Sequence, residues 1–362
     1  MNILKEPDFL KNSSYKSARL ITLQNKNGLI AQFTNYGARW VSMWIPDQQG
    51  KFDDVILGFD TLNGYINAGE QYHGAIVGRV CGRINRACFS LNDKTYNLAA
   101  NDVYGSPVKN HLHGGIKAFH NRLWEIINVG EDTVTLSLFS PNGEESYPGN
   151  LTVCVTYTLT SENSLLMECK ATTDQPTPVN LTNHAFFNLQ NNTQHKNILS
   201  HSLKLQSTSI VTCDKELIPT GTIKNISGTY LDFSSPKTIA SSILSGDNVV
   251  KKDNGFSIAF LLEKTGLDFD WTATLEDTES GRKMEIYTNQ PSLQVYTGYF
   301  MDGTDTGHGN IKYFASAGIA LEPQGYPDAP NQPSFPSIII DSNNLYKHIT
   351  EYKFSVKCNS EV

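Results

Sequence analysis

The chain has 362 residues, of which 39% are hydrophobic and 18% are charged. This composition supplies a sizeable apolar core and argues against a disordered chain. Lys and Arg number 29 against 36 Asp and Glu, a formal net charge of −7, which disfavours binding to nucleic acid or to an anionic membrane through charge alone.

The chain begins MNILKEPDFLKNSSYKS, where acidic residues and Pro7 appear early and no long apolar segment follows. No later segment approaches the ~18 apolar residues of a membrane helix. We therefore expect neither a signal peptide nor a membrane span, and a cytoplasmic location. The six cysteines form no CxxC pair and no Cys/His cluster with zinc spacing. Neither a structural metal nor a disulfide framework is expected from them.

Along the chain, the predicted elements are mainly strands. Two segments are long enough for two helical turns at most, DTLNGYINAG (60–69) and SPKTIASSIL (235–244). The alternation of a strand with one buried face occurs at 134–138, 151–159, 165–171 and 352–358. Turn dipeptides occur at Asn142-Gly143, Asn254-Gly255 and Asp302-Gly303.

The fold class follows from these elements. The strand–helix alternation of a parallel α/β sheet is missing. The sequence therefore predicts an all-β protein with large, mainly antiparallel sheets, arranged as a sandwich or a barrel-like stack. No Gly/Ser- or Pro-rich linker, low-complexity block or fixed-period repeat divides the chain. We expect one continuous domain over residues 1–362.

Three residues are candidate acids or bases. His113 lies in NHLHGG, His184 in PVNLTNHAFFNL and Glu322 in GIALEPQGYPDAPNQPSFP. Histidine titrates near neutral pH, and a carboxyl beside apolar residues acquires a raised pKa that suits a base. Structural roles fit the same patterns: a turn residue for His113, a buried hydrogen-bonded residue for His184, and an exposed strand end for Glu322.

Arg79 and Arg83, in GRVCGRINR, are spaced i, i+4 and are predicted to lie on one strand and point the same way. They fit either a pair of cations that hold a ligand or a salt-bridged sheet face. Taken alone, the residues predict a β-rich enzyme or a sugar-binding module and leave the choice open.

Several segments, in this order along the chain, resemble the aldose 1-epimerase (galactose mutarotase) family. They are VGRVCGRI, HLHGG, SPNGEESYPG, TPVNLTNHAFFNL, LIPTG, YTNQPSLQVYTG and LEPQGYPDAPNQPSFP. The resemblance implies a β-supersandwich fold without cofactor or metal, and interconversion of the α and β anomers of a free aldose such as galactose or glucose. The expected partner is this small-molecule sugar, with no nucleic acid and no membrane, and a monomer or homodimer is expected.

Opening a pyranose ring requires a base for the proton of the C1 hydroxyl and an acid for the ring oxygen. The resemblance places the general acid at His184 and the general base at Glu322. It also implies a second histidine at the catalytic site and four further substrate contacts: His113, Arg83, Gln294, Asn183 and Ser257.

Two positions depart from the family pattern. Gly82 stands where many members have Asn, and Ser257, in NGFSIAF, stands where the family has an Asp that contacts sugar hydroxyls. A hydroxyl carries no charge and forms weaker hydrogen bonds than a carboxylate; Asp253 is one candidate replacement. The alternative function is therefore a non-catalytic or altered-specificity sugar-binding protein on the same fold. An epimerase for a uronic or phosphorylated sugar ranks lower, because no additional basic cluster is evident.

Overall fold

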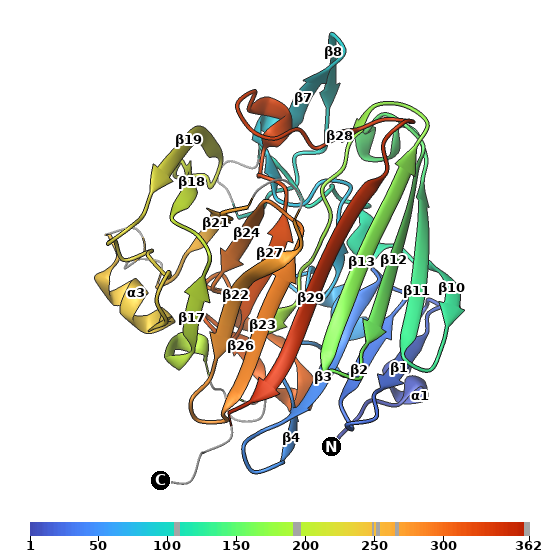
Figure 1. The fold of residues 1–362 in the computed structure, drawn as a ribbon. Helices are drawn as coiled ribbons and strands as arrows, with labels where there is room; N and C mark the ends of the chain where they lie inside the picture. The colour runs from blue at the N-terminus through green and yellow to red at the C-terminus, as the bar shows by residue number, and fades with distance from the viewer. Residues whose placement is uncertain (105–108, 191–196, 248–249, 251–253, 265–267, 358–362) are drawn as a thin grey trace.

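The computed structural model describes residues 1–104, 109–190, 197–247, 250, 254–264 and 268–357. Its strands form three main sheets (Figure 1). The large sheet has, in spatial order, β10 (Glu125–Val129), β11 (Thr133–Ser140), β12 (Leu151–Leu159), β13 (Ser164–Thr173), β29 (Tyr346–Val356), β23 (Arg282–Thr288), β22 (Asp270–Glu276), β17 (Ser202–Leu205) and β20 (Lys237–Thr238). The N-terminal sheet has β1 (Leu20–Gln24), β2 (Ile30–Thr34), β3 (Arg39–Pro46) and β4 (Phe52–Asp54). The cleft sheet has β16 (Phe186–Phe187), β27 (Ile319–Gln324), β24 (Ser292–Tyr296), β21 (Ser257–Leu261), β18 (Ser209–Cys213) and β19 (Pro219–Asn225).

Short strand pairs and helices connect these sheets. The pairs are β5 (Ile76–Val77) with β15 (Thr182–Asn183), β6 (Arg83–Ile84) with β9 (His111–Leu112), β7 (Cys88–Leu91) with β8 (Lys94–Asn97), β14 (Thr177–Pro178) with β28 (Ile339–Ile340), and β25 (Asp302–Thr306) with β26 (Lys312–Phe314). The described helices are α1 (Glu6–Phe9), α2 (Leu62–Asn67) and α3 (Ile239–Ser245), with 3-10 turns η1 (Asn85–Ala87), η2 (Phe119–Asn121), η3 (Glu144–Ser146), η4 (Ile198–Ser200), η5 (His308–Asn310) and η6 (Ala329–Asn331). All of the described helices are too short or too polar to cross a lipid bilayer.

The predicted all-β class is confirmed, and the ladders of the three main sheets are antiparallel. The predicted alternation is seen in β12, where Leu151, Val153 and Val155 are buried while Thr152 is exposed. The two predicted short helices are α2 and α3; α1 was not predicted. The end of the last predicted strand, at Cys358, lies outside the described residues.

Aromatic side chains join the sheets into layers around one main core. Phe33 of β2 stacks on Tyr157 of β12 with ring centroids 4.5 Å apart, so the N-terminal sheet packs on the large sheet, which it overlaps in Figure 1. Phe187 of β16 lies 5.6 Å from Tyr352 of β29, so the cleft sheet also packs on the large sheet. Burial of this shared apolar surface is the main force that holds the layers together.

Two sequence predictions about local structure are wrong. Arg79 and Arg83 do not share a strand, because the chain turns between them at Gly82, whose φ is +73°. Arg79 lies before β6 and is buried, and its guanidinium donates to the carbonyls of Pro148 (2.7 Å) and Gly149 (3.0 Å). The Asp302-Gly303 dipeptide, predicted as a turn, belongs to β25, because a glycine at positive φ can kink a strand without ending it.

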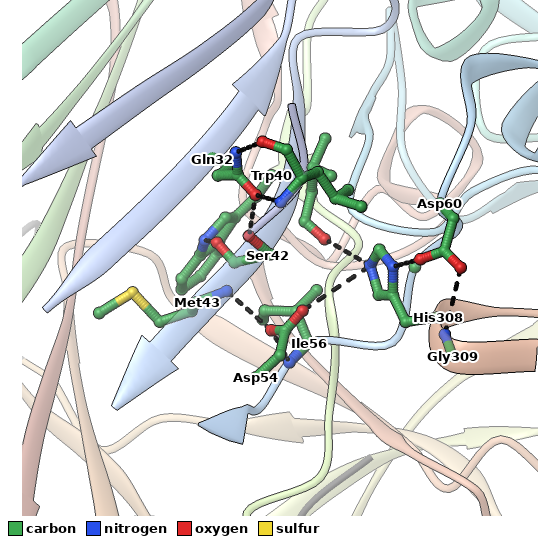
Figure 2. Close-up of polar contacts among 12 residues, drawn as sticks. Gln32, Trp40, Ser42, Met43, Asp54, Ile56, Asp60, His308 and Gly309 are labelled. Carbon is green, nitrogen blue, oxygen red and sulfur yellow. Dashed lines mark hydrogen bonds and ion pairs between the residues drawn. The ribbon is translucent and has the colours of Figure 1, made fainter. Parts of the chain in front are cut away.

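A network of charged side chains joins Asp60, His308 and Asp54 (Figure 2). Nδ1 of His308 lies 2.9 Å from Asp60, and its Nε2 lies 3.7 Å from Asp54 on β4. Asp54 also accepts hydrogen bonds from the N–H groups of Met43 and Ile56. Burial alone would lower the pKa of His308, but the two carboxylates outweigh burial and raise it. Because α2 begins at Leu62, shortly after Asp60, the network holds the start of the helix against η5 and β4.

Candidate active site

The cleft sheet forms the floor of a central cavity, since alternate side chains of a strand point to the same face. Glu322 on β27 lies directly opposite Gln294 on β24. Ser257 on β21 lies opposite Tyr296, two residues beyond Gln294 on β24. All four line the cavity, whose empty volume is about 670 Å³ when space open to solvent is counted. Leu321, the neighbour of Glu322, points to the opposite face and belongs to the core.

Two histidines lie over this floor, each at the end of a short strand. His184 follows β15; its N–H donates to the Ala75 carbonyl (2.8 Å), and its carbonyl accepts from the N–H of Gly74 (2.9 Å). His113 follows β9, and its N–H donates to the Gly82 carbonyl (3.1 Å). The two imidazole rings meet edge to face with centroids 5.2 Å apart. Short strand pairs thus bring two distant parts of the sequence to one cavity.

His184 and Glu322 face each other in the cavity. His184 Nε2 lies 3.7 Å from Glu322 Oε1, and the two side chains are only 4% and 3% exposed. This separation is too long for a direct hydrogen bond. Within the described structure, Glu322 Oε2 has no hydrogen-bond partner. A buried carboxyl oxygen without a partner is unfavourable for folding and is available to a ligand.

Burial shifts the pKa values of both groups towards their neutral forms. It raises the pKa of Glu322 to about 8, and the charge of Glu70 adds to this rise while that of Arg83 opposes it. It lowers the pKa of His184 to about 4. Between these values the pair holds one proton. A Glu322 carboxylate beside a protonated His184 has the same proton count, so the pair can give and take a proton at two ligand atoms without changing its total charge.

The His113 imidazole is held in one tautomer. Its Nδ1 accepts a hydrogen bond from the Gly82 N–H at 3.2 Å. Burial, assisted by the charge of His184, lowers the pKa of His113 well below its usual value, so the ring is neutral and Nε2 is the donor. Gly114 allows this tight loop: its φ is +87°, and a Cβ there would lie 1.9 Å from the Gly78 carbonyl oxygen.

Arg83 is fixed by a carboxylate that sequence reasoning missed. Its Nε donates to Asp102 at 2.7 Å, and the Asp102 side chain is fully buried. The N–H of Tyr104 donates to the same carboxylate at 3.2 Å. Asp102 therefore orients the guanidinium at the cavity wall, which Arg83 lines.

Sequence reasoning also missed Glu70, Tyr104 and Gln324, which line the cavity. Gln324 could have been found, because it follows Glu322 by two residues and therefore shares its face of β27. Glu70 and Tyr104 lie in loops, where no periodic pattern marks them.

Two uncharged polar residues of the floor, Gln294 and Ser257, contact each other. Gln294 Nε2 donates to Ser257 Oγ at 2.9 Å. The serine hydroxyl can still donate its own proton to a ligand, but it supplies no charge. Asp253, the candidate replacement for the missing carboxylate, lies outside the described residues.

Asn183 is not among the described residues that line the cavity, and its expected sugar contact stays a prediction. Its Nδ2 donates to the Gly74 carbonyl (2.8 Å) and the Tyr157 hydroxyl (3.1 Å). Its Oδ1 accepts from the N–H of Ala185 (2.9 Å). Both amide hydrogens are used, and the residue is buried. Asn183 thus supports the backbone around His184, through Ala185 and through Gly74, whose N–H bonds the His184 carbonyl.

The central cavity thus contains six of the seven residues predicted from the sequence: Glu322, His184, His113, Arg83, Gln294 and Ser257. Within the described part of the chain, no three His, Cys, Asp or Glu side chains gather at a potential metal site.

Comparison with known proteins identifies the family. The family model for aldose 1-epimerase matches residues 19–353. Galactose mutarotase of Bos taurus is 40% identical over 322 residues, which cover 89% of this chain and 90% of the relative. Aldose 1-epimerase of Haemophilus influenzae is 37% identical over 341 residues, which cover 93% of this chain and 95% of the relative.

Solved structures agree with the sequence relatives. An aldose epimerase homologue from C. elegans matches with a TM-score of 0.85 at 29% identity, over 94% of this chain and 99% of that one. Galactose 1-epimerase from Lactobacillus acidophilus matches with a TM-score of 0.79 at 25% identity, over 94% and 95%. The chain therefore belongs to the aldose 1-epimerase family, enzymes that interconvert the anomers of sugars.

Proposed function

We propose that this enzyme interconverts the α and β anomers of a free aldohexose such as galactose or glucose, with Glu322 as general base and His184 as general acid. The observation that carries the proposal is the facing pair itself: a buried carboxyl and a buried imidazole 3.7 Å apart in one cavity. Each such group contributes roughly 10²–10⁴-fold to a proton-transfer reaction.

The pair balances the protons of the whole reaction. Glu322 takes the proton of the C1 hydroxyl while His184 gives a proton to the ring oxygen, and the C1–O5 bond breaks to leave an open-chain aldehyde. Rotation about C1–C2 presents the other face of the aldehyde. The reverse transfers then close the ring and restore both groups. During the open-chain stage Glu322 is protonated and His184 is neutral, the state that burial favours. The cavity therefore stabilises the pair at the stage when the ring is open.

Three side chains supply hydrogen-bond donors for the sugar. They are the neutral imidazole of His113 through Nε2, the guanidinium of Arg83 and the amide of Gln294, all of which line the cavity. These donors are held in place by Gly82, Asp102 and Ser257, respectively. Because they are already ordered, they orient the sugar with little loss of side-chain conformational entropy on binding.

The chain is proposed to act as one domain over residues 1–362, as a monomer or homodimer. The main core supports this view, because it includes residues from Ile21 to Phe354. The five described cysteines are free, which fits the reducing cytoplasm, the compartment proposed for the enzyme.

Polarimetry on freshly dissolved α-D-galactose and α-D-glucose tests the proposal. We expect the enzyme to accelerate mutarotation, with kcat/KM falling above about pH 8 and below about pH 4, where the pair loses its single proton or gains a second. Thermal stabilisation by sugar without any acceleration would instead select a non-catalytic sugar-binding protein. Xylose and arabinose in the same assay define the preferred aldose.

A further inference from the structure

A second carboxyl group, Glu70, faces the same cavity as the acid–base pair. It follows α2, lines the cavity and is only 9% exposed. The Tyr104 hydroxyl donates to its Oε2 at 2.9 Å, and the Tyr72 N–H donates to its Oε1 at 3.3 Å. The Asp305 carboxylate accepts hydrogen bonds from the backbone N–H groups of Gly69 (2.7 Å) and Glu70 (3.0 Å). Contacts from two distant segments, at Tyr104 and Asp305, and from the neighbouring Tyr72 therefore fix the position of Glu70.

No ion pair within the described fold neutralises this carboxyl, although the charge of Arg39 and two hydrogen bonds partly oppose the effect of burial on its pKa. Among the described residues, no Lys, Arg or His forms an ion pair with Glu70, and its two hydrogen-bond donors are neutral. Burial accordingly raises the pKa of Glu70 to about 7. A buried carboxyl without a cation is unfavourable for stability, and such arrangements concentrate where a ligand uses them.

Glu70 lies at an aromatic wall that adjoins the cavity floor. Tyr104, which holds the carboxyl, packs against Phe300 with ring centroids 4.9 Å apart. Phe300 in turn packs against Tyr296, 6.1 Å away, on the same face as Glu322. Glu70 is close enough to Glu322 for its charge to raise the pKa of that carboxyl. Both carboxyls line the same cavity, so one ligand can contact both groups.

Glu70 also supplies the carboxyl group that Ser257 lacks. The floor position of Ser257 offers only a neutral hydroxyl, already bonded to Gln294. Among the described residues that line the cavity, Glu70 and Glu322 are the two that carry a carboxyl group. Because Glu322 serves as the base in the proposed mechanism, Glu70 is the carboxyl left to accept a hydrogen bond from a sugar hydroxyl.

We propose that Glu70 is a substrate-contacting, specificity-determining residue, which accepts a hydrogen bond from one hydroxyl of an uncharged aldose and disfavours sugars that carry a carboxylate or phosphate. This inference rests on the proposed function and extends it. The ionised carboxyl of Glu70 repels an anionic substrate, since the nearby Arg83 is paired with Asp102. A hydrogen bond to a charged group discriminates by roughly 10- to 100-fold when the partner hydroxyl is removed.

The test compares wild type, Glu70→Gln and Glu70→Ala on galactose and its 2-, 3-, 4- and 6-deoxy derivatives, with kcat/KM from polarimetry and Kd from calorimetry. In wild type we expect one deoxy position to lower kcat/KM by roughly 10- to 100-fold relative to galactose. In Glu70→Ala the penalty at that position should nearly disappear, while penalties at the other positions remain. Glu70→Gln should also raise kcat/KM for galacturonate relative to kcat/KM for galactose. Equal deoxy penalties in wild type and Glu70→Ala would overturn the inference.

Tyr104→Phe is the matched control. It removes the hydroxyl that holds Glu70 but leaves the carboxyl. If Glu70 contacts the sugar, loss of the same hydroxyl should therefore still lower kcat/KM in this variant. A purely structural role of Glu70 would not produce this result. The ratio of Kd for each deoxy sugar to Kd for galactose gives the same comparison without depending on turnover. Sugar binding without catalysis refutes the epimerase proposal alone, active enzyme with an unchanged deoxy profile refutes the Glu70 contact alone, and no sugar binding at all refutes both.

Discussion

Replacing Glu322 by Gln is expected to abolish most of the catalysis and, at alkaline pH, to stabilise the fold. Gln has nearly the same shape as Glu and can occupy the same place opposite Gln294 in the β24–β27 ladder. It cannot take a proton from the C1 hydroxyl. We expect kcat for galactose mutarotation to fall by roughly 10²–10⁴-fold, the contribution of a general base.

The gain in stability follows from the raised pKa. The pKa of Glu322 rises from the usual 4.5 to about 8 in the fold. A group with a raised folded-state pKa contributes stability that is fully present below its unfolded pKa and is lost as pH rises through the folded pKa. Each pH unit corresponds to ~1.4 kcal/mol. Between pH 4.5 and about pH 8 the unfolded carboxyl is ionised while the folded one keeps its proton, so the free energy of unfolding falls by on the order of 5 kcal/mol across this range. Gln does not titrate, so the variant does not lose this stability as pH rises.

Two measurements on the same samples check this reasoning. Polarimetry gives the loss of activity, and thermal unfolding at pH 5, 7 and 9 gives the stability. We expect the melting temperature of the Gln variant to exceed that of wild type by a margin that grows from pH 5 to pH 9. If the variant loses activity but melts at the same temperature as wild type at every pH, Glu322 is not a buried carboxyl with a raised pKa. Retained activity would reject Glu322 as the base.

Three further predictions concern residues around the site. Asp102→Asn removes the charge that orients Arg83; we expect KM for galactose to rise by roughly 10-fold, and an unchanged KM would contradict the orienting role. Gly82→Asn should fold with a free energy of unfolding within about 1 kcal/mol of wild type by denaturant titration, since Asn tolerates positive φ and the added Cβ lies 3.6 Å from its nearest neighbour, Pro327. His308→Gln leaves Asp54 buried without its facing cation and should destabilise the protein by ~3–5 kcal/mol at pH 7. This loss should shrink at pH 5, where Asp54, with its pKa raised to about 6 by burial, is protonated; equal losses at both pH values would contradict the ion-pair explanation.

Much of the fold could be predicted from local pattern. The alternation at 151–159 predicts β12 and its buried face, because side-chain direction in a strand depends only on the local backbone. The two segments at 60–69 and 235–244, long enough for two helical turns at most, correspond to α2 and α3. The resemblance to aldose 1-epimerases, carried by ordered motifs such as TPVNLTNHAFFNL, predicted the family that the comparisons confirm.

Local pattern failed where the chain turns or where contacts are distant in sequence. The spacing of Arg79 and Arg83 predicted a shared strand, but the positive φ of Gly82 separates them. Asn183 lies beside His184 in the sequence, but its amide hydrogens bond Gly74 and Tyr157, contacts that no local pattern indicates. A motif shows which residues occur together; it does not show which of them face the cavity.

By itself, the sequence determined the strand periodicity, the family and the identities of the acid and base candidates, because each of these depends on residue type and local order. Only the tertiary structure decided that His184 and Glu322 meet across 3.7 Å, that Asp102 holds Arg83, and that Glu70 enters the same cavity. It also decided the pKa directions of these groups, since desolvation and neighbouring charges exist only once distant segments pack together.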